Sequence, residues 1–311
     1  MKRITISTGC FNEEDNVCAL RERIDAVFQQ LPDYSYELIF IDNHSTDRTV
    51  EKIKALAAED KRIKLIVNAR NFGHIRSPYH ALLQGKGEAV INMVSDLQDP
   101  PELIPEFLKK WEEGSKIVVA VKNQSQETKL MWLIRRFYYW LLFKIADVKV
   151  IQNFTGYGLY DRQVVEIIRS LDDPYPYFRG IIAEIGFEPA VVPFVQPLRK
   201  RGITKNNFYT LYDMAMLGIT SHSKVPIRLA TMGGFFLAFV SLMISLAYLV
   251  LKLAFWDTFA MGMAPIIIGV FFFGSIQLFF IGLLGEYVAA IHTQVLKRPH
   301  VIEQERVNFD D

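Results

Sequence analysis

The sequence is poor in cysteine and carries almost no excess of charge. Its 311 residues include two cysteines, Cys10 and Cys18, and 35 basic against 34 acidic side chains give a formal net charge of +1. Two cysteines with no partner cluster build neither a disulfide framework nor a zinc site, and they fit a reducing compartment. The balanced charge argues against a protein built mainly to coat nucleic acid, so we expect no nucleic-acid partner.

Common catalytic and nucleotide-binding motifs are also missing. Gly85-Lys86-Gly87 reads as a helix end, and nothing matches a dinucleotide fingerprint or a Walker A loop, which argues against a dehydrogenase or a P-loop ATPase. The six histidines are scattered, with no Ser-His-Asp spacing, and fit surface or interface positions better than ligand positions. Residues 1–10 have no apolar signal core or cleavage site, so we expect the amino-terminal part to stay in the cytoplasm.

Apolar residues, by contrast, are abundant. Half of the chain is hydrophobic and 23 residues are phenylalanine, which excludes intrinsic disorder. Two stretches without a charged residue, 229–251 and 258–285, are each long enough as helices to exceed the roughly 30 Å hydrocarbon core of a bilayer. They predict a transmembrane hairpin, and the alternative is a buried hairpin of a soluble protein.

Basic residues flank this predicted hairpin. Those that precede the first stretch or follow the second are His222, Lys224, Arg228, His292, Lys297, Arg298 and Arg306. The short loop between the stretches has Lys252 as its single basic residue. By the positive-inside rule, we expect a multi-pass protein of the cell's inner (plasma) membrane, with both termini and the amino-terminal domain in the cytoplasm.

Upstream of Pro226, short apolar runs alternate with segments of helical pattern. The runs, rich in isoleucine and valine as in strands covered on both faces, are 4–8, 36–41, 63–67, 89–94 and 117–121. The expected helices are 13–30, 47–58 with Ser45 and Thr46 as cap candidates, 77–84 and 102–113. This alternation predicts an α/β fold with a mostly parallel, doubly wound sheet, in which ligands sit beyond the carboxyl ends of the strands.

Two further segments are apolar but too short to span a bilayer. Residues 129–144 read KLMWLIRRFYYWLLFK, in which apolar and aromatic side chains surround Arg135 and Arg136. This composition suits an interfacial helix, and an ordinary core helix is the alternative. Residues 207–218 form a similar candidate that leads toward the first apolar stretch. Both helices would hold the soluble domain against the lipid bilayer.

Acidic clusters follow three of the predicted strands, at 11–15, 42–47 and 95–102. Any one of them alone fits a helix cap, but three at one edge of a sheet predict a binding site. Asp96 and Gln98 are two positions apart on an extended segment, so a carboxylate and an amide oxygen would face the same side. These are ligands for a divalent cation, Mg²⁺ or Mn²⁺, which can stabilise the charge on a leaving diphosphate.

Taken in order, these motifs resemble those of the polyprenyl-phosphate glycosyltransferases of glycosyltransferase family two, the group that includes dolichyl-phosphate mannose synthases and bactoprenol glucosyl transferases. The resemblance covers nearly the whole chain, and its most specific part is the Asp-Leu-Gln-Asp-Pro-Pro-Glu stretch at 96–102. The other matching motifs are Phe11-Asn12-Glu13-Glu14, Asp42 with Ser45-Thr46-Asp47, Arg70-Asn71-Phe72-Gly73, Arg199 with Gly202, Thr204 and Lys205, and Gly285-Glu286-Tyr287.

The resemblance implies a nucleotide-sugar-binding GT-A catalytic domain over 1–206, which includes the interfacial helix at about 129–145. A juxtamembrane helix at 207–225, a transmembrane hairpin at 226–290 and a cytoplasmic tail at 291–311 complete the expected organisation. In donor binding, Glu13 and Asp42 would contact the nucleoside. Asp96, which also contributes to donor binding, and Gln98 would hold the metal ion.

Two positions depart from the family's pattern. Val94 stands where relatives carry the first aspartate of an Asp-Ala-Asp motif, and Gly156 stands where relatives often carry an aspartate proposed as the base. A polyprenyl phosphate with a second pKa of about 6 would arrive already ionised, so the proposed acceptor needs no base. An anionic nucleophile needs positioning and charge screening instead.

Four basic residues are candidates for contacting the acceptor phosphate: Arg135, Arg136, Arg199 and Lys205. The alternative is that they face anionic lipid headgroups, which fits Arg135 and Arg136 equally well. The residues expected to act in catalysis are Asp96, Gln98, Arg199 and Lys205.

The leading hypothesis is an inverting transfer of a sugar from a nucleoside-diphosphate sugar to a membrane polyprenyl phosphate on the cytoplasmic face. The carboxylates missing at positions 94 and 156 motivate an alternative, a catalytically silent membrane protein that binds a nucleotide sugar or scaffolds a partner. A processive polysaccharide synthase fits less well, because a Gln-x-x-Arg-Trp element is absent. The sequence does not decide whether the protein forms a homo-oligomer, or which nucleoside and which sugar its donor carries.

Overall fold

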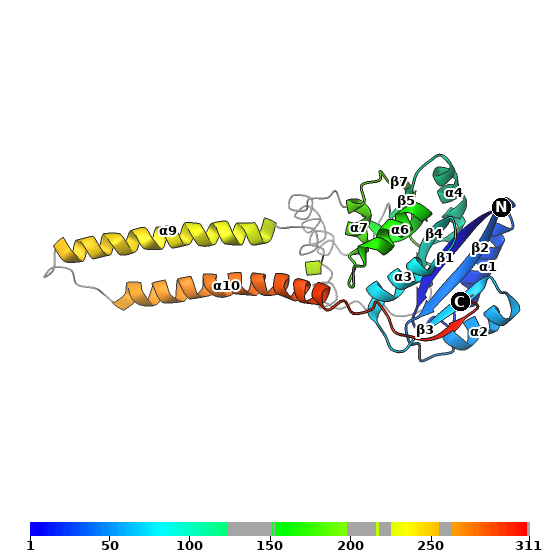
Figure 1. Ribbon diagram of the computed structural model, residues 1–311, viewed down its shortest axis with the longest axis horizontal. Helices are drawn as coiled ribbons and strands as arrows, with labels where there is room; N and C mark the ends of the chain where they lie inside the picture. Colours follow the sequence, from blue (N-terminus) through cyan, green and yellow to red (C-terminus); the bar gives the residue numbers. More distant parts are fainter. Residues whose placement is uncertain (123–150, 152, 198–215, 218–224, 255–262, 310–311) are drawn as a thin grey trace.

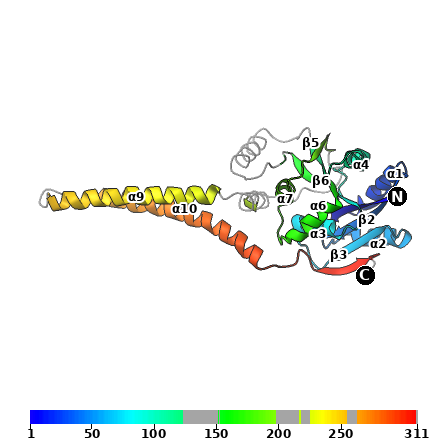
Figure 2. The same ribbon diagram turned by 45° about the horizontal axis from the view of Figure 1, so that its top comes forward.

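The computed structural model describes residues 1–122, 151, 153–197, 216–217, 225–254 and 263–309. These residues form an α/β domain from which two long helices project side by side (Figures 1 and 2). Both ends of the chain lie in the α/β domain (Figure 1). The chain therefore leaves the domain, runs through the helix pair and returns.

A mixed sheet of eight strands, counted over the described residues, forms the centre of the domain in the order β7-β5-β6-β4-β1-β2-β3-β8. The strands are β1 (Lys2–Cys10), β2 (Tyr34–Asp42), β3 (Ile63–Asn68), β4 (Ala89–Val94), β5 (Ile117–Lys122), β6 (Phe154–Asp161), β7 (Ala190–Phe194) and β8 (Glu303–Val307). Strands β6 and β8 run antiparallel to their neighbours, and the other pairings are parallel. The predicted mostly parallel sheet is confirmed.

Helices cover both faces of the sheet and bury apolar stripes against it. One face carries α1 (Val17–Phe28), α2 (Thr49–Glu59) and α4 (Ile104–Glu112), which share one apolar cluster with the sheet. The other carries α3 (Gly73–Gln84), α6 (Arg162–Leu171) and α7 (Phe178–Glu184). Fully buried side chains such as Leu20 and Ile168 each stabilise the fold by about 1.5–3 kcal/mol, so the doubly wound layers follow from the apolar pattern.

Helices α1 and α2 begin later than the sequence pattern predicts, whereas α3 begins at Gly73, before the predicted residue 77. The segment expected to be helical from residue 13 forms a turn first, in which the Asn16 amide donates to the Glu13 carbonyl oxygen at 2.9 Å, and α1 starts at Val17. Ser45 and Thr46 do not cap α2. The Asp47 carboxylate accepts from the Thr49 amide at 3.0 Å instead, which leaves the Ser45 hydroxyl to contact a strand end.

The sheet has its topological switch point between β1 and β4. From β1 the chain moves to β2 and β3 on one side, and β4 then pairs on the other side of β1. The register aligns Gly9 with Val94 and Cys10 with Asp42, so the carboxyl ends of β1, β2 and β4 lie at one edge. A crevice at such a point is where doubly wound proteins bind ligands.

Strand β6 lies between β4 and β5 and comes very close to β5. A Cβ atom added at Gly158 would lie 2.3 Å from the Val118 carbonyl oxygen, so only glycine fits there. The sequence pattern does not predict this strand, because its glycines at 156 and 158 read as a loop. It places Gly156 beside the carboxyl end of β4.

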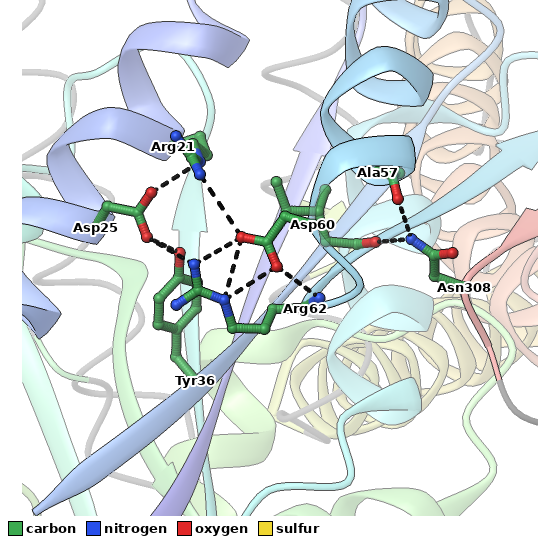
Figure 3. A network of polar contacts seen from close by, with 8 residues as sticks. Arg21, Asp25, Tyr36, Ala57, Asp60, Arg62 and Asn308 are labelled. Atoms are coloured by element: carbon green, nitrogen blue, oxygen red, sulfur yellow. Dashed lines mark hydrogen bonds and ion pairs between the residues drawn. The ribbon is translucent and has the colours of Figure 1, made fainter.

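A charged network joins the amino-terminal ends of β2 and β3 to α1 (Figure 3). Arg62 donates to Asp60 at 2.6 Å and to Asp25 at 3.2 Å, and Asp25 also accepts from Tyr36. The Arg62 hydrogen bond is the main cause that holds the pKa of Asp60 below its ordinary value. Because this network lies at the edge opposite the switch point, we interpret it as structural.

The helix pair consists of α9 (Val225–Ala254) and α10 (Met263–Val295). Within them, Val225–Ile244 and Phe272–Val295 are long and apolar enough to cross a membrane, and neither segment is buried. Large apolar side chains face outward, for example Phe235 with 73% exposure and Phe279 with 68%. The predicted interfacial helix at about 129–145 lies outside the described residues, and of the predicted helix at 207–218 the structure describes 216–217, which are helical.

Strand β8 returns the chain from α10 to the edge of the sheet. It pairs antiparallel with β3, with Leu65 opposite Val307, and residues 296–302 alone connect it to α10. The Asn308 amide group then donates to the carbonyl oxygens of Ala57 and Ile63 at 2.7 and 2.8 Å (Figure 3). Part of the segment expected to be a cytoplasmic tail is thus a strand of the α/β domain, which its polar sequence does not predict.

Candidate active site

The carboxylate of Asp42 ends strand β2 and is fully buried. It accepts hydrogen bonds from the Ser45 amide at 2.8 Å and from the Ser45 hydroxyl. Burial is the main cause that raises the pKa of Asp42 above its ordinary value, and the Ser45 hydrogen bonds act in the opposite direction. The turn therefore fixes this carboxylate at the edge of the sheet.

The loop after β1 is joined to the loop after β2 by hydrogen bonds. Asn12, in a left-handed conformation with φ of 58°, donates its amide to the Ser45 hydroxyl at 2.9 Å and accepts from the Thr46 amide at 2.8 Å. The Glu13 amide donates to the Thr49 hydroxyl at 2.8 Å, and its carboxylate accepts from Asn16 at 2.5 Å. The first two predicted acidic clusters thus form one connected structure, with Glu13 and Asp42 both buried in it.

The loop after β3 is held by asparagine side chains. The Asn43 side chain accepts from the Phe72 amide at 2.8 Å and donates to Asn71 at 2.9 Å. Asn68 donates to Asn43 at 3.3 Å and to the Ser77 hydroxyl at 3.0 Å. These bonds position the start of α3 beside the switch point.

The loop after β4 carries the predicted metal ligands. The Ser95 hydroxyl donates to the Gly9 carbonyl oxygen at 2.9 Å, which ties this loop across the switch point to β1. The Gln98 amide donates to the Asp96 carboxylate at 3.1 Å, and the turn between them places Leu97 in the left-handed region with φ of 63°. Asp96 and Gln98 therefore lie together in a tight turn rather than on an extended segment.

Asp99 is a buried carboxyl group that the sequence motif contains but does not single out. It accepts from the Val94 amide at 3.0 Å, and burial raises its pKa to about 7. Tyr157 donates to the neighbouring Pro100 carbonyl oxygen at 2.5 Å. Asp99 thus stabilises the turn from the buried side, whereas Asp96 is partly exposed. A sequence pattern does not reveal this difference in burial.

The residues at this turn fit a divalent cation. Among the described residues, no group of three or more histidine, cysteine or acidic side chains could hold a metal ion by itself. Mg²⁺ needs no such cage, because it binds through one or two carboxylates together with substrate phosphates and water. The carboxylate of Asp96 and the amide oxygen of Gln98 supply suitable hard ligands, whereas Val94, 44% exposed, supplies none.

A cavity of about 180 Å³ lies at the switch point, between α3, the end of β4, the start of β6 and α7. Its lining includes Gly9, Asn92, Thr155 and Gly156, with His74 and Arg179 as its basic side chains. Asn92 is held by donating to the Gly156 carbonyl oxygen at 3.1 Å. The sequence pattern does not identify this cavity, because its walls come from segments that are far apart in the chain.

The structure does not place the other predicted site residues at this edge. Arg135, Arg136, Arg199 and Lys205 lie outside the described residues. Gly285-Glu286-Tyr287 lies on α10. The structure therefore brings together Glu13 and Asp42 and places Asp96 and Gln98 at the same edge of the sheet, while their assigned roles stay predictions.

A doubly wound sheet with acidic loops at the carboxyl ends of β1, β2 and β4 defines the GT-A class of fold. A family model described as glycosyl transferase family 2 matches residues 5–168. The chain belongs to glycosyltransferase family 2, and it is a glycosyltransferase.

Relatives align over nearly the full length of both chains. A prophage-derived bactoprenol glucosyl transferase of Shigella flexneri is 33% identical over 301 residues, which cover 96% of this chain and 97% of the relative. A bactoprenol glucosyl transferase of Shigella phage SfV is 32% identical over 306 residues, or 98% and 99% of the two chains. Among solved structures, a mannosyltransferase from Pyrobaculum calidifontis with GDP-Man and Mn²⁺ gives a TM-score of 0.46 at 15% identity, covering 96% and 88%.

Proposed function

We propose that the protein transfers a sugar, with inversion, from a nucleoside-diphosphate sugar to the phosphate of a membrane polyprenol on the cytoplasmic face. One observation carries the proposal: the acidic loops and the cavity share the sheet edge near which the apolar helix pair joins the domain. Glu303 pairs with Asn68 at the carboxyl end of β3, and residues 296–302 alone connect it to α10. The names of the relatives, bactoprenol glucosyl transferases, support the acceptor class.

In the proposed reaction, a phosphate oxygen of the acceptor forms a bond to the anomeric carbon of the sugar. The bond from that carbon to the diphosphate breaks, and its electron pair leaves with the nucleoside diphosphate. A phosphate monoester with a second pKa of about 6 is already ionised at neutral pH, so no proton has to be removed. This agrees with the lining of the cavity, where Gly156 presents no carboxylate.

The protein's own contribution is to bind and orient the two substrates. Glu13 and Asp42 would hold the nucleoside at the ends of β1 and β2, and Asp96 with Gln98 would hold Mg²⁺ or Mn²⁺ beside β4. When bound, a divalent ion neutralises charge on the leaving diphosphate. Effective positioning of reactants accounts for roughly 7–11 kcal/mol of barrier reduction in favourable cases, which suits a reaction that lacks a base.

The return of the chain to the sheet supports the proposed topology. Strand β8 belongs to the same sheet as β1, so the residues before α9 and after α10 lie on one side of any membrane that the pair crosses. The excess of basic residues at both ends of the pair favours the cytoplasmic side. A site on this side meets an acceptor whose isoprenoid tail stays in the bilayer.

The test is transfer by the purified full-length protein in detergent. It is incubated with Mg²⁺ or Mn²⁺, a panel of labelled nucleotide sugars and a polyprenyl phosphate. We expect lipid-extractable label with at least one donor, none when the polyprenol lacks its phosphate, and inverted configuration in the product. No lipid-extractable label from any donor would reject the proposal.

The missing carboxylates at Val94 and Gly156 favour a second candidate, a protein that binds a nucleotide sugar without turnover. The two candidates differ in a direct measurement. Donor binding by calorimetry together with no product would support the silent protein, whereas any measurable turnover would exclude it.

A further inference from the structure

Charge is unevenly distributed along the carboxyl edge of the sheet. Carboxylates lie at the ends of β2 and β4, where Asp42 is buried and Asp96 partly exposed. The cavity on the other side of the β4 end is lined by His74 and Arg179, and its described lining contains no aspartate or glutamate. The edge therefore has an acidic part and a basic part side by side.

The basic part also contains a polar atom without a partner. The hydroxyl oxygen of Thr155 is buried and has no hydrogen-bond partner among the described residues, although Thr155 lines the cavity. Leaving such a group unpaired is costly, so a ligand that bonds to it binds more tightly. The neighbouring Asn92 is already used, since it contacts Gly156 at 3.1 Å.

Building on the proposed function, we propose that this cavity binds the phosphate group of the acceptor, with the positive charge supplied by Arg179 and hydrogen bonds by His74 and Thr155. A volume of about 180 Å³ equals roughly six water molecules. It has room for a phosphate and the first atoms attached to it.

The two substrates differ in whether basic side chains of the protein must neutralise their phosphate charge. The diphosphate of the donor brings a divalent ion, and that ion fits the acidic turn at Asp96. The phosphate of the acceptor brings none, so the protein has to supply its counter-charge. Burial, and then the charge of Arg179, lower the pKa of His74 below its ordinary value, which favours the neutral imidazole. A bound anion would favour the protonated form instead.

Gly156 agrees with an anionic ligand. Its φ is +102°, and a Cβ atom there would lie 3.6 Å from the Asn92 side-chain nitrogen and from the Phe178 ring. A side chain at this position would thus enter the cavity, and a carboxylate would repel a phosphate. Glycine keeps the space open and uncharged.

The place of the cavity favours the acceptor over the donor. Helices α3 and α7, which form two of its walls, lie on the side of the domain that faces the helix pair (Figure 1). Leu217, which precedes α9 by eight residues, also lines it. Of the predicted nucleoside contacts, Glu13 instead lies in the loop after β1 and Asp42 at the end of β2.

The experiment uses the full-length protein in detergent with farnesyl phosphate, a soluble polyprenyl phosphate. Arg179→Gln and His74→Gln remove the basic groups, Arg179→Lys retains the charge, and Lys109→Gln removes one positive charge from the exposed surface of α4. Initial rates are measured while donor and acceptor are varied separately. Binding of farnesyl phosphate to each protein is measured by calorimetry, with farnesol as the probe that lacks the phosphate.

We expect Arg179→Gln to raise KM for the acceptor about tenfold or more, with KM for the donor changed less than twofold. The same variant should weaken binding of farnesyl phosphate but not of farnesol, and Arg179→Lys should recover most of the loss. Unchanged constants, or a rise in KM for the donor instead, would overturn the proposal. If the native protein shows no transfer, the proposed function fails, while the calorimetry still decides whether the cavity binds a phosphate.

Discussion

The Nε2 atom of His80 in α3 lies 2.6 Å from Oε1 of Glu303 in β8, although 223 residues separate the two along the chain. Arg306 also contacts the Glu303 carboxylate. Burial favours the neutral acid, but Arg306 and His80 together hold the pKa of Glu303 below its ordinary value. This cluster fastens the strand that follows the helix pair to the helix that forms a wall of the cavity.

We expect Glu303→Gln to loosen β8 from the sheet. The substitution removes a charged acceptor for two partners, so the free energy of unfolding should fall by about 1–3 kcal/mol. Hydrogen exchange of the amides in 303–307 is the measurement, and faster exchange than in the native protein is the expected result. Lys54→Gln is the control, because the Lys54–Glu305 pair is about 40% exposed on both sides and contributes no more than about 1 kcal/mol. Equal effects of the two substitutions would contradict this account.

Glu37 provides a pH-dependent test of stability in the α/β domain. Its side chain is 1% exposed and lies 2.9 Å from Lys64, which is 6% exposed, and it accepts from Thr5 at 2.5 Å. We expect Glu37→Gln to cost about 3–5 kcal/mol, because it leaves the Lys64 charge buried without its partner. Chemical unfolding at neutral pH measures this cost.

The same pair predicts how the cost changes with acid. Burial raises the pKa of Glu37, but hydrogen bonds from Thr5 and Lys64 outweigh it, so the net pKa lies below the ordinary value of 4.5. The ionised group therefore stabilises the fold fully above about pH 4.5, and this contribution is lost as pH falls through the pKa of the folded state. The stability difference between native and Glu37→Gln proteins should shrink below pH 4.5, and a difference that stays constant would refute the assignment.

Asp96→Ala tests the proposed metal role. We expect sugar transfer to fall at least about a hundredfold, because the turn loses its carboxylate ligand and the leaving diphosphate loses its charge stabilisation. Activity as a function of Mn²⁺ concentration is the measurement. Glu106→Gln, which removes one exposed carboxylate from α4, is the matched control. Full activity in Asp96→Ala would remove Asp96 from this role.

Asp42→Asn tests donor binding at the end of β2. Both side-chain oxygens of Asp42 already accept from Ser45, so the amide keeps the shape of the turn only in part and loses the charge. We expect KM for the nucleotide sugar to rise about tenfold, with KM for the acceptor unchanged. Glu51→Gln, at an exposed position of α2, should leave both constants unchanged. A change confined to the acceptor would show that Asp42 does not bind the donor.

Much of the sheet can be predicted from the sequence, because buried parallel strands are continuous apolar runs. The run at 63–67, for example, corresponds to β3 at Ile63–Asn68, whose residues are all buried. Strand β8, Glu303–Val307, carries charged side chains instead, because an edge strand has one side open to solvent. Strand β6 contains Gly158, which its close contact with β5 requires and which reads as a loop.

The candidate site is predictable to a similar degree. Acidic motifs after strands locate Asp42 and Asp96, since the carboxyl ends of parallel strands share an edge. The cavity could not be predicted in this way. His74 and Arg179 reach it from two different helices, lie 105 residues apart in the sequence and share no motif. The burial of Asp99 likewise follows from packing, which a local pattern does not contain.

Strand β8 is also the last strand of the sheet to leave the ribosome. The edge of β3 therefore stays unpaired until both long helices have been synthesised. In the proposed topology, β8 can reach this edge only if α10 ends on the side of the membrane where α9 began. A chain inserted with one crossing too few would expose an unpaired strand edge, which promotes aggregation. In the proposed topology, closure of the sheet would thus act as a check on insertion of the helix pair.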